Sequence, residues 1–145
     1  MTIWFTIPEI DEMNKFSENT LVAHLGIRFT EIGGDYLKAT MPVDHRTHQP
    51  MGILHGGASV VLSETLASVG AFLCVDTSEK YCVGLEINAN HIRSVRDGMV
   101  TGIGCPAHIG KTTQIWEVRI TDEKNRLTCL SRVTMAILSN PTRSS

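Results

Sequence analysis

One long apolar segment, residues 56–75, limits what this chain can fold into more than any other feature. The segment carries a single charged side chain, Glu64, and begins directly after His55. Its length and composition predict a helix that is apolar on nearly all sides, and such a helix must be covered all round. Several Ser and Thr residues in it argue against contact with lipid, so we interpret it as the core helix of a globular protein.

The segments on both sides of this helix have the alternation and the turn signals of β-strands. We expect six strands, at residues 26–32, 37–43, 82–94, 99–108, 112–121 and 127–138. Two short helical segments, residues 8–16 and 21–25, are expected before them. Short connections between successive strands predict an antiparallel sheet. We therefore predict an α+β fold with a curved antiparallel sheet wrapped around one long central helix, in a single domain spanning residues 1–145.

The composition argues against several classes of function. The 145 residues are 42% hydrophobic and 19% charged, with a net charge of −2 and no runs of Arg or Lys. Neither nucleic acid nor a membrane is therefore expected as a partner. No signal peptide is evident and the four cysteines form no C-x-x-C pair, so we expect a cytoplasmic protein with reduced thiols. His45 and His48 lie near Asp44, but this loop lacks further ligands, and no metal site is expected.

Glu64 is the first candidate for chemistry. A carboxylate alone in apolar surroundings loses hydration, so we expect its pKa to be raised, as is common at functional sites. The helix start at residues 55–57 exposes unpaired backbone N–H groups and the positive end of the helix dipole. Such a helix start suits the oxyanion formed in acyl transfer. Ser68 lies one helical turn beyond Glu64, and Gln49 can add an amide donor.

The spacing of Gly56 and Glu64 predicts an active site that is shared between subunits. The two residues are eight positions apart, which is about 12 Å along one helix. An attacking group and an oxyanion donor must both lie about 3 Å from the reacting centre. One helix cannot easily supply both groups. We therefore expect Glu64 of one subunit to act with Gly56 of another across a two-fold axis.

Two stretches of the chain resemble the hotdog-fold acyl-CoA thioesterases. Residues 49–64 read QPMGILHGGASVVLSE, and residues 84–93 read GLEINANHIR. The likeness covers about residues 24–138, and a Gln six positions before the His of H-G-G, with a Glu eight after its first Gly, is a specific signature. The resemblance implies a hotdog fold, an acyl-CoA substrate, no cofactor, and a homotetramer built from two dimers.

The same resemblance implies roles for individual residues. Glu64 is the catalytic carboxylate, either as nucleophile on the thioester carbonyl or as base for water, and Gly56 donates its N–H to the thioester oxygen. Gln49 and His55 position or polarise the thioester, and Ser68 orients the hydrolytic water. The acyl group and the CoA arm are expected at Val69, Gly84, His91, Ile92, Arg93, Ser94, His108, Ile109, Gly110, Lys111, Thr112, Thr113 and Ser139.

The substrate and some of the roles have alternatives. The resemblance favours aromatic acyl-CoA, with 1,4-dihydroxy-2-naphthoate as the acyl group and broad side activity. One alternative is a proofreading thioesterase that removes misloaded groups from a carrier protein, and another is a non-catalytic acyl-CoA-binding module. In purely structural interpretations, Glu64 pairs with a buried partner and His55 is a hydrogen-bonded core histidine. Ser68 then bonds the carbonyl one turn back, and Gln49 closes a turn.

Overall fold

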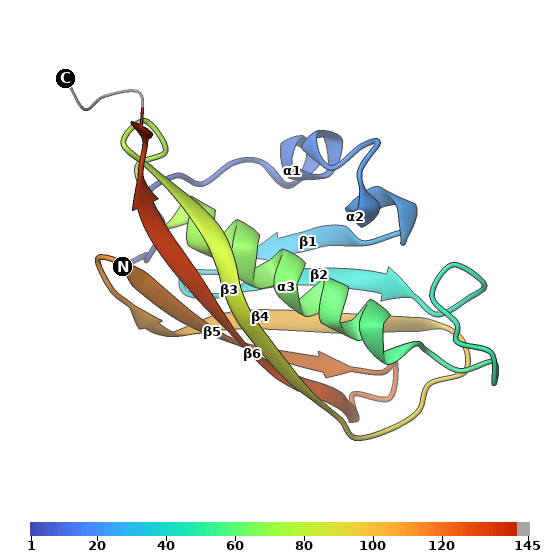
Figure 1. Cartoon of the computed structure of the whole chain (residues 1–145). Helices are drawn as coiled ribbons and strands as arrows, with labels where there is room; N and C mark the ends of the chain where they lie inside the picture. The colour runs from blue at the N-terminus through green and yellow to red at the C-terminus, as the bar shows by residue number, and fades with distance from the viewer. Residues whose placement is uncertain (142–145) are drawn as a thin grey trace.

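The computed structural model describes residues 1–141 (Figure 1). Within them the chain forms three helices, α1 (Ile10–Phe16), α2 (Leu21–His24) and α3 (Gly56–Leu73). The six strands are β1 (Arg28–Ile32), β2 (Leu37–Pro42), β3 (Lys80–His91), β4 (Met99–Ile109), β5 (Thr113–Thr121) and β6 (Leu127–Ser139). The predicted order of elements is confirmed, with small shifts at their ends. Residues 142–145 of the predicted domain lie outside the described part of the chain.

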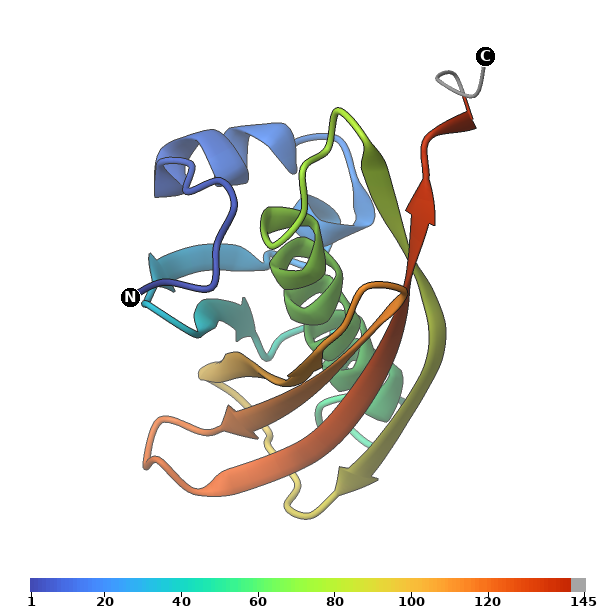
Figure 2. The same cartoon turned by 90° about the vertical axis from the view of Figure 1, so that its left-hand side faces the viewer.

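The strands form one antiparallel sheet in the order β1-β2-β4-β5-β6-β3. Figures 1 and 2 show this sheet curving around α3, which confirms the predicted hotdog arrangement. Not all strands that follow one another in the chain are neighbours in the sheet. β3 pairs with β6 instead of β4, because residues 92–98 cross from one edge of the curved sheet to its middle.

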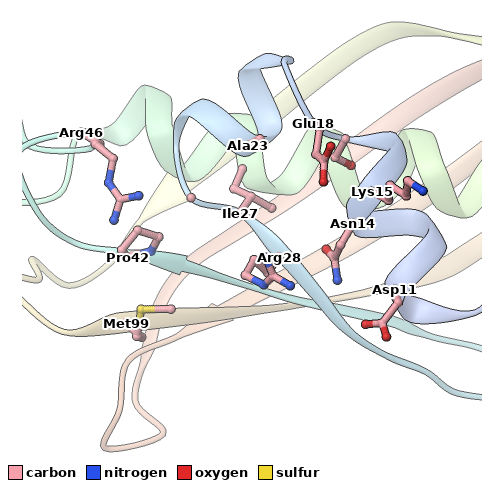
Figure 3. Close-up of a pocket in the computed structure, with 12 residues that line it drawn as sticks. Asp11, Asn14, Lys15, Glu18, Ala23, Ile27, Arg28, Pro42, Arg46 and Met99 are labelled. Carbon is pink, nitrogen blue, oxygen red and sulfur yellow. The ribbon is translucent and has the colours of Figure 1, made fainter.

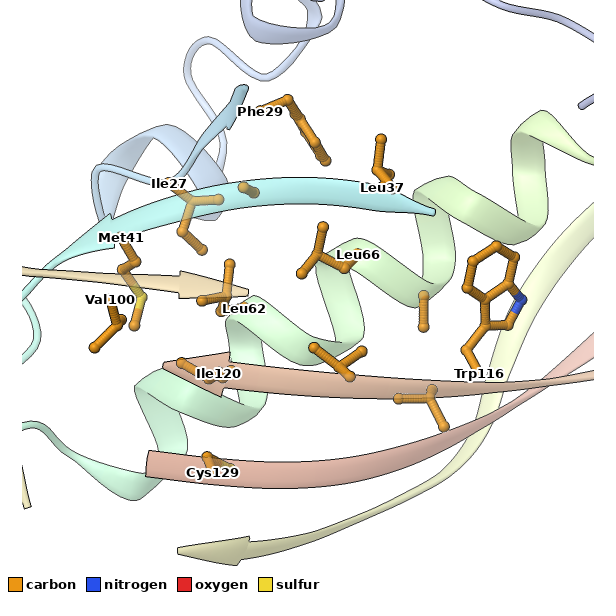
Figure 4. Close-up of a cluster of buried hydrophobic side chains, with 14 of the residues drawn as sticks. Ile27, Phe29, Leu37, Met41, Leu62, Leu66, Val100, Trp116, Ile120 and Cys129 are labelled. Carbon is orange, nitrogen blue, oxygen red and sulfur yellow. The ribbon is translucent and has the colours of Figure 1, made fainter. Parts of the chain in front are cut away.

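The face of α3 that points to the sheet forms the core. Leu62, Leu66 and neighbouring alanines of the helix are fully buried against side chains from the strands, among them Met41 and Trp116 (Figure 4). Gly70 allows the closest approach, since a Cβ there would lie 2.6 Å from the Trp116 ring. By length and composition α3 is the one helix of the described residues that could cross a membrane, and half of it is buried in the protein. The interpretation of α3 as a core helix is therefore correct for the face that points to the sheet.

The prediction that α3 is covered all round is wrong for the single chain. Gly57, Glu64 and Phe72 are exposed, and Val61 and Ser68 between them are only half-buried. Intervals of three and four residues place these five positions on one side of the helix, which we call the open face of α3. The sheet ends beside this face at β3, a 12-residue edge strand that is mostly exposed. Six strands are thus too few to enclose the helix.

A β-bulge changes which side chains of β3 point to α3. Gly84 pairs with Met135 while Glu86 pairs with Thr134, so Leu85 is an extra residue in the strand. Alternation alone would turn Gly84 and His91, seven positions apart, to opposite sides of the sheet. With the bulge, Gly84 contacts the Glu64 carboxylate and His91 contacts Gly56, both on α3.

The N-terminal segment fastens the C-terminal end of α3. The Trp4 ring stacks on Trp116 with 6.1 Å between the ring centroids, and its indole N–H donates to the Gly33 carbonyl at 2.6 Å. The Phe5 backbone N–H donates to the Leu73 carbonyl at 2.8 Å. This contact satisfies one of the carbonyls that a helix leaves unpaired at its end.

Candidate active site

A cavity of about 320 Å³ lies at the N-terminal end of α3, and we call it the helix-start cavity. Its wall combines Gln49 and Gly56 with residues 91–94, so predicted site residues from distant parts of the sequence meet here. A Cβ on Gly56 would lie 2.8 Å from His91 Nε2. Glycine therefore leaves the imidazole in this position and lets a ligand approach the backbone, whereas a larger residue would displace the ring.

His55 fixes the start of the helix. Its Nδ1 accepts the Gly57 backbone N–H at 2.8 Å, which is the role of an N-cap side chain. A neutral imidazole whose Nδ1 accepts a hydrogen bond carries its proton on Nε2. Because His55 is exposed, the interpretation as a core histidine is wrong. Its Nε2–H is available to donate to a ligand.

The backbone N–H of Gly56 remains unpaired among the described residues. Gly57 donates to the His55 side chain and Ala58 to the His55 carbonyl, but no hydrogen bond of the described part uses the Gly56 N–H. The group lies at the wall of the helix-start cavity, at the positive end of the helix dipole. It can donate to an oxyanion, as the sequence predicts.

Gln49 closes a turn and also keeps a donor. Its Oε1 accepts the Met51 N–H, and its backbone carbonyl accepts the Gly52 N–H at 2.9 Å. The structural interpretation of Gln49 is thus confirmed. The side-chain amide nitrogen has no partner in the described residues, and Gln49 lines the cavity, so a donor role is compatible with the turn.

Hydrogen bonds join the two walls of this cavity. His48 Nε2 lies 2.8 Å from the Arg96 carbonyl oxygen, and the Leu54 N–H donates to the Val95 carbonyl at 2.8 Å. These contacts tie the loop that carries Gln49 to the segment that carries Arg93. Sequence reasoning considered His48 only as a metal ligand, because nothing in the local pattern indicates a partner 48 residues away.

Glu64 lies two turns further along α3 and does not line this cavity. Its side chain is exposed, so its apolar neighbours do not bury it in the single chain, and no ion pair within residues 1–141 includes it. The reason is that Glu64 belongs to the open face of α3. A Cβ on Gly84 would lie 2.8 Å from Glu64 Oε1, so β3 passes directly beside the carboxylate.

Two serines of α3 contact β6. The Ser68 hydroxyl lies 3.9 Å from Met135 Sδ, and residues 1–141 show no hydrogen bond from it to the carbonyl one turn back, which was the alternative interpretation. The buried Ser131 hydroxyl donates to Ser63 Oγ at 2.7 Å. Since Ser63 directly precedes Glu64, this bond helps set the rotation of α3 that directs Glu64 toward β3. The sequence analysis did not predict the Ser63–Ser131 pair. The only feature of the sequence that points to it is a serine on the buried face of an apolar helix.

The remaining predicted residues gather at the opposite end of α3. A second cavity, of about 420 Å³, is lined there by residues 109–111 together with Lys80 and Cys74, and we call it the helix-end cavity. Ser139 pairs with Lys80 at the start of β3, and His108, Thr112 and Thr113 belong to the same β4–β5 hairpin. Val69 packs against the core. One chain therefore holds predicted residues at both ends of α3, with Glu64, Ser68 and Gly84 between them.

A larger cleft, of about 610 Å³, lies away from these residues (Figure 3). It separates α1 and α2 from β1 and β2, and charges of both signs line it, including Asp11, Lys15 and Arg28. Arg46 at its edge is paired with Asp44, and this guanidinium holds the Asp44 pKa well below its usual range. None of the predicted site residues lines the cleft. Among the described residues no three His, Cys, Asp or Glu side chains gather as metal ligands.

A curved antiparallel sheet around one helix, with unpaired donors at the helix start and a carboxylate two turns on, is the architecture of a hotdog-fold thioesterase. The chain belongs to the thioesterase superfamily, whose family model matches residues 51–129, and it is a thioester hydrolase. It is 53% identical to the 1,4-dihydroxy-2-naphthoyl-CoA hydrolase of Escherichia coli K12 over 136 residues, which cover 94% of this chain and 99% of that protein.

Solved structures of thioesterases share the fold closely. A mutant thioesterase from Pseudomonas aeruginosa matches with a TM-score of 0.94 at 46% identity, covering 96% of this chain and 100% of that one. A thioesterase from Haemophilus influenzae matches with a TM-score of 0.94 at 42% identity, covering 99% and 100%. The family resemblance noted in the sequence is therefore confirmed.

Proposed function

We propose that this protein hydrolyses aromatic acyl-CoA thioesters to the free acid and CoA. Its main substrate in this proposal is 1,4-dihydroxy-2-naphthoyl-CoA, used in the cytoplasm for menaquinone biosynthesis, with side activity on other acyl-CoA esters. Gln49 and Gly56 line the same cavity, and the exposed His55 directly precedes Gly56 at the start of α3, which supports thioester chemistry. The identity to the Escherichia coli enzyme supports the choice of acyl group.

We infer that the active sites form between two subunits. The open face of α3 exposes Glu64 and Phe72, and the free edge of β3 exposes Tyr81, Val83 and Leu85. An edge strand of this length with apolar side chains is prone to pair with another chain. Two subunits related by a two-fold axis near Val60 would bring Glu64 of each beside Gly56 of the other. The predicted tetramer would then consist of two such dimers.

The chemistry follows from this arrangement. The Gly56 N–H donates to the carbonyl oxygen of the thioester, and the Gln49 amide and His55 Nε2–H add donors beside it. Glu64 of the partner subunit attacks the carbonyl carbon or removes a proton from the water that attacks it. The negative charge that develops on oxygen is stabilised by the donors. The C–S bond then breaks, CoA leaves and takes up a proton, and water supplies the second oxygen of the acid.

The Glu64→Gln variant tests this proposal. It keeps the size of the side chain but removes the nucleophile or base, so we expect kcat to fall by about 10²- to 10⁴-fold. Release of free thiol is measured on a panel of acyl-CoA esters that includes 1,4-dihydroxy-2-naphthoyl-CoA. Glu117→Gln, on an exposed β5 position paired with Arg132, is the matched control and should leave kcat unchanged. Near-normal turnover by Glu64→Gln would refute the mechanism, and binding of CoA esters without thiol release by the wild type would favour a binding module.

A further inference from the structure

We propose that Lys80 of one subunit binds the phosphate groups of the CoA arm in a shared active site. The partner subunit contributes the start of α3 to that site. The inference rests on the proposed function and on the shared site. It assigns a ligand to the helix-end cavity and a role to a lysine at the beginning of β3.

Two lysines line the helix-end cavity without an ion pair in the described part of the chain. Lys80 and Lys111 both line it, and neither forms an ion pair among the described residues. Asp76 also lines it, but its Oδ1 accepts the backbone N–H of Ser78 at 2.9 Å and the Ser78 hydroxyl at 2.7 Å. Two uncommitted ammonium groups at a cavity are suited to an anion that enters from outside.

The inner wall of the same cavity offers a further donor. Gln114 is fully buried, and its Oε1 accepts the Trp116 indole N–H at 2.9 Å. Because the indole can only donate, this contact fixes which end of the amide is oxygen. The Gln114 Nε2 is left without a partner among the described residues. A buried donor rarely stays unpaired, so it is an independent sign of a missing acceptor.

The bulge in β3 determines which way Lys80 points. Before Leu85, the even-numbered positions Lys80, Cys82 and Gly84 face α3, and Lys80 is half-buried as a result. After Leu85, the odd-numbered positions, such as His91, face α3. Lys80 and His91 therefore lie on the same side of the sheet, at opposite ends of one strand.

The two-fold axis then brings the two cavities together. On α3, Val60 lies midway between Gly56, which contacts His91 of β3, and Glu64, which contacts Gly84 of β3. The matching midpoint of β3 is near Ile87, so an axis there relates residue 80 of one subunit to about residue 94 of the other. Residues 91–94 line the helix-start cavity. Lys80 of the partner subunit is thus placed beside Arg93 and Ser94.

This position fits the charge of the substrate. CoA carries a diphosphate and a 3′-phosphate at the end remote from the thioester, while the chain has a net charge of −2. A thioester held at Gly56 would extend past Arg93 to Lys80 and Lys111 of the partner subunit. Charged hydrogen bonds from ammonium groups to phosphate are stronger than neutral ones and would anchor the arm.

The test compares substrates with and without phosphates. KM and kcat are measured for wild type, Lys80→Ala and Lys80→Glu on benzoyl-CoA and on the benzoyl thioester of pantetheine, which lacks the phosphates. We expect KM for benzoyl-CoA to rise about fivefold in Lys80→Ala, the effect of one partly exposed ion pair, and further in Lys80→Glu. We expect kcat to stay unchanged, and both constants for the pantetheine thioester to stay at the wild-type values. Lys15→Ala, an exposed lysine on α1, is the matched control for loss of charge.

An unchanged KM for benzoyl-CoA, or an equal loss on the pantetheine thioester, would overturn the proposal. Calorimetric titration with free CoA separates it from the proposed function, because that measurement needs no hydrolysis. Weaker CoA binding by Lys80→Ala supports the site even if the wild type proves inactive. Dephospho-CoA, which lacks the 3′-phosphate, identifies the contact. If Lys80 binds the 3′-phosphate, Lys80→Ala will not weaken the binding of dephospho-CoA. If Lys80 binds the diphosphate, Lys80→Ala will weaken the binding of both ligands.

Discussion

The contact between Gly84 and Glu64 predicts that a single added methyl group will slow catalysis without unfolding the protein. A Cβ at position 84 would lie 2.8 Å from Glu64 Oε1, whereas ordinary van der Waals contact begins at 3.4 Å. The carboxylate oxygen must therefore move by about 0.6 Å. Gly84 is not among the residues with positive φ, so the backbone itself accepts alanine. A displacement of about 1 Å can cost 100-fold in rate, so we expect kcat of Gly84→Ala to fall roughly 10- to 100-fold.

The assay is thiol release from benzoyl-CoA with separate determination of kcat and KM, alongside thermal unfolding. The matched control is Gly34→Ala, where an added Cβ meets no atom closer than 3.4 Å. We expect the control to keep wild-type kinetics and both variants to keep a melting temperature near that of the wild type. If Gly84→Ala retains kcat within twofold of the wild type, the Gly84 contact does not set the position of Glu64, the proposed catalytic carboxylate.

Two further predictions concern the dimer and the pH dependence of stability. Glu64→Gln and His55→Ala subunits, each inactive alone, should recover about a quarter of wild-type activity after joint refolding, because half of the dimers then contain one intact shared site. No recovery despite proven mixed dimers would place each site within one chain. Arg126 lowers the pKa of Asp122 in the folded protein. The Asp122 carboxylate therefore stabilises the fold at pH values above the pKa of an unfolded Asp, about 3.9, and this stabilisation is lost as the pH falls through the lower pKa of the folded state. Asp122→Asn should therefore flatten the fall of melting temperature between about pH 5 and pH 2, and an unchanged slope would contradict the role of this pair.

Local patterns in the sequence determined the elements and much of the chemistry. The apolar run after His55 predicted α3, and alternation of apolar and polar residues predicted the strands, because helix and strand periodicity depend only on near neighbours. The position of His55 before two glycines likewise marked the helix start, where the structure shows its Nδ1 accepting the Gly57 N–H. The family signature supplied the roles of Gln49, Gly56 and Glu64, which remain proposals for this chain.

Tertiary structure alone decided how those residues meet. The pairing of β3 with β6 leaves β3 at an edge and opens one face of α3, which is why Glu64 is exposed although its neighbours in sequence are apolar. The extra residue Leu85 turns both Gly84 and His91 toward the helix, yet a bulge of one residue leaves no mark in an alternating pattern. Strand order and exposure depend on contacts between residues far apart in the chain. The sequence could therefore place a carboxylate on a helix, but only the folded sheet decides what lies beside it.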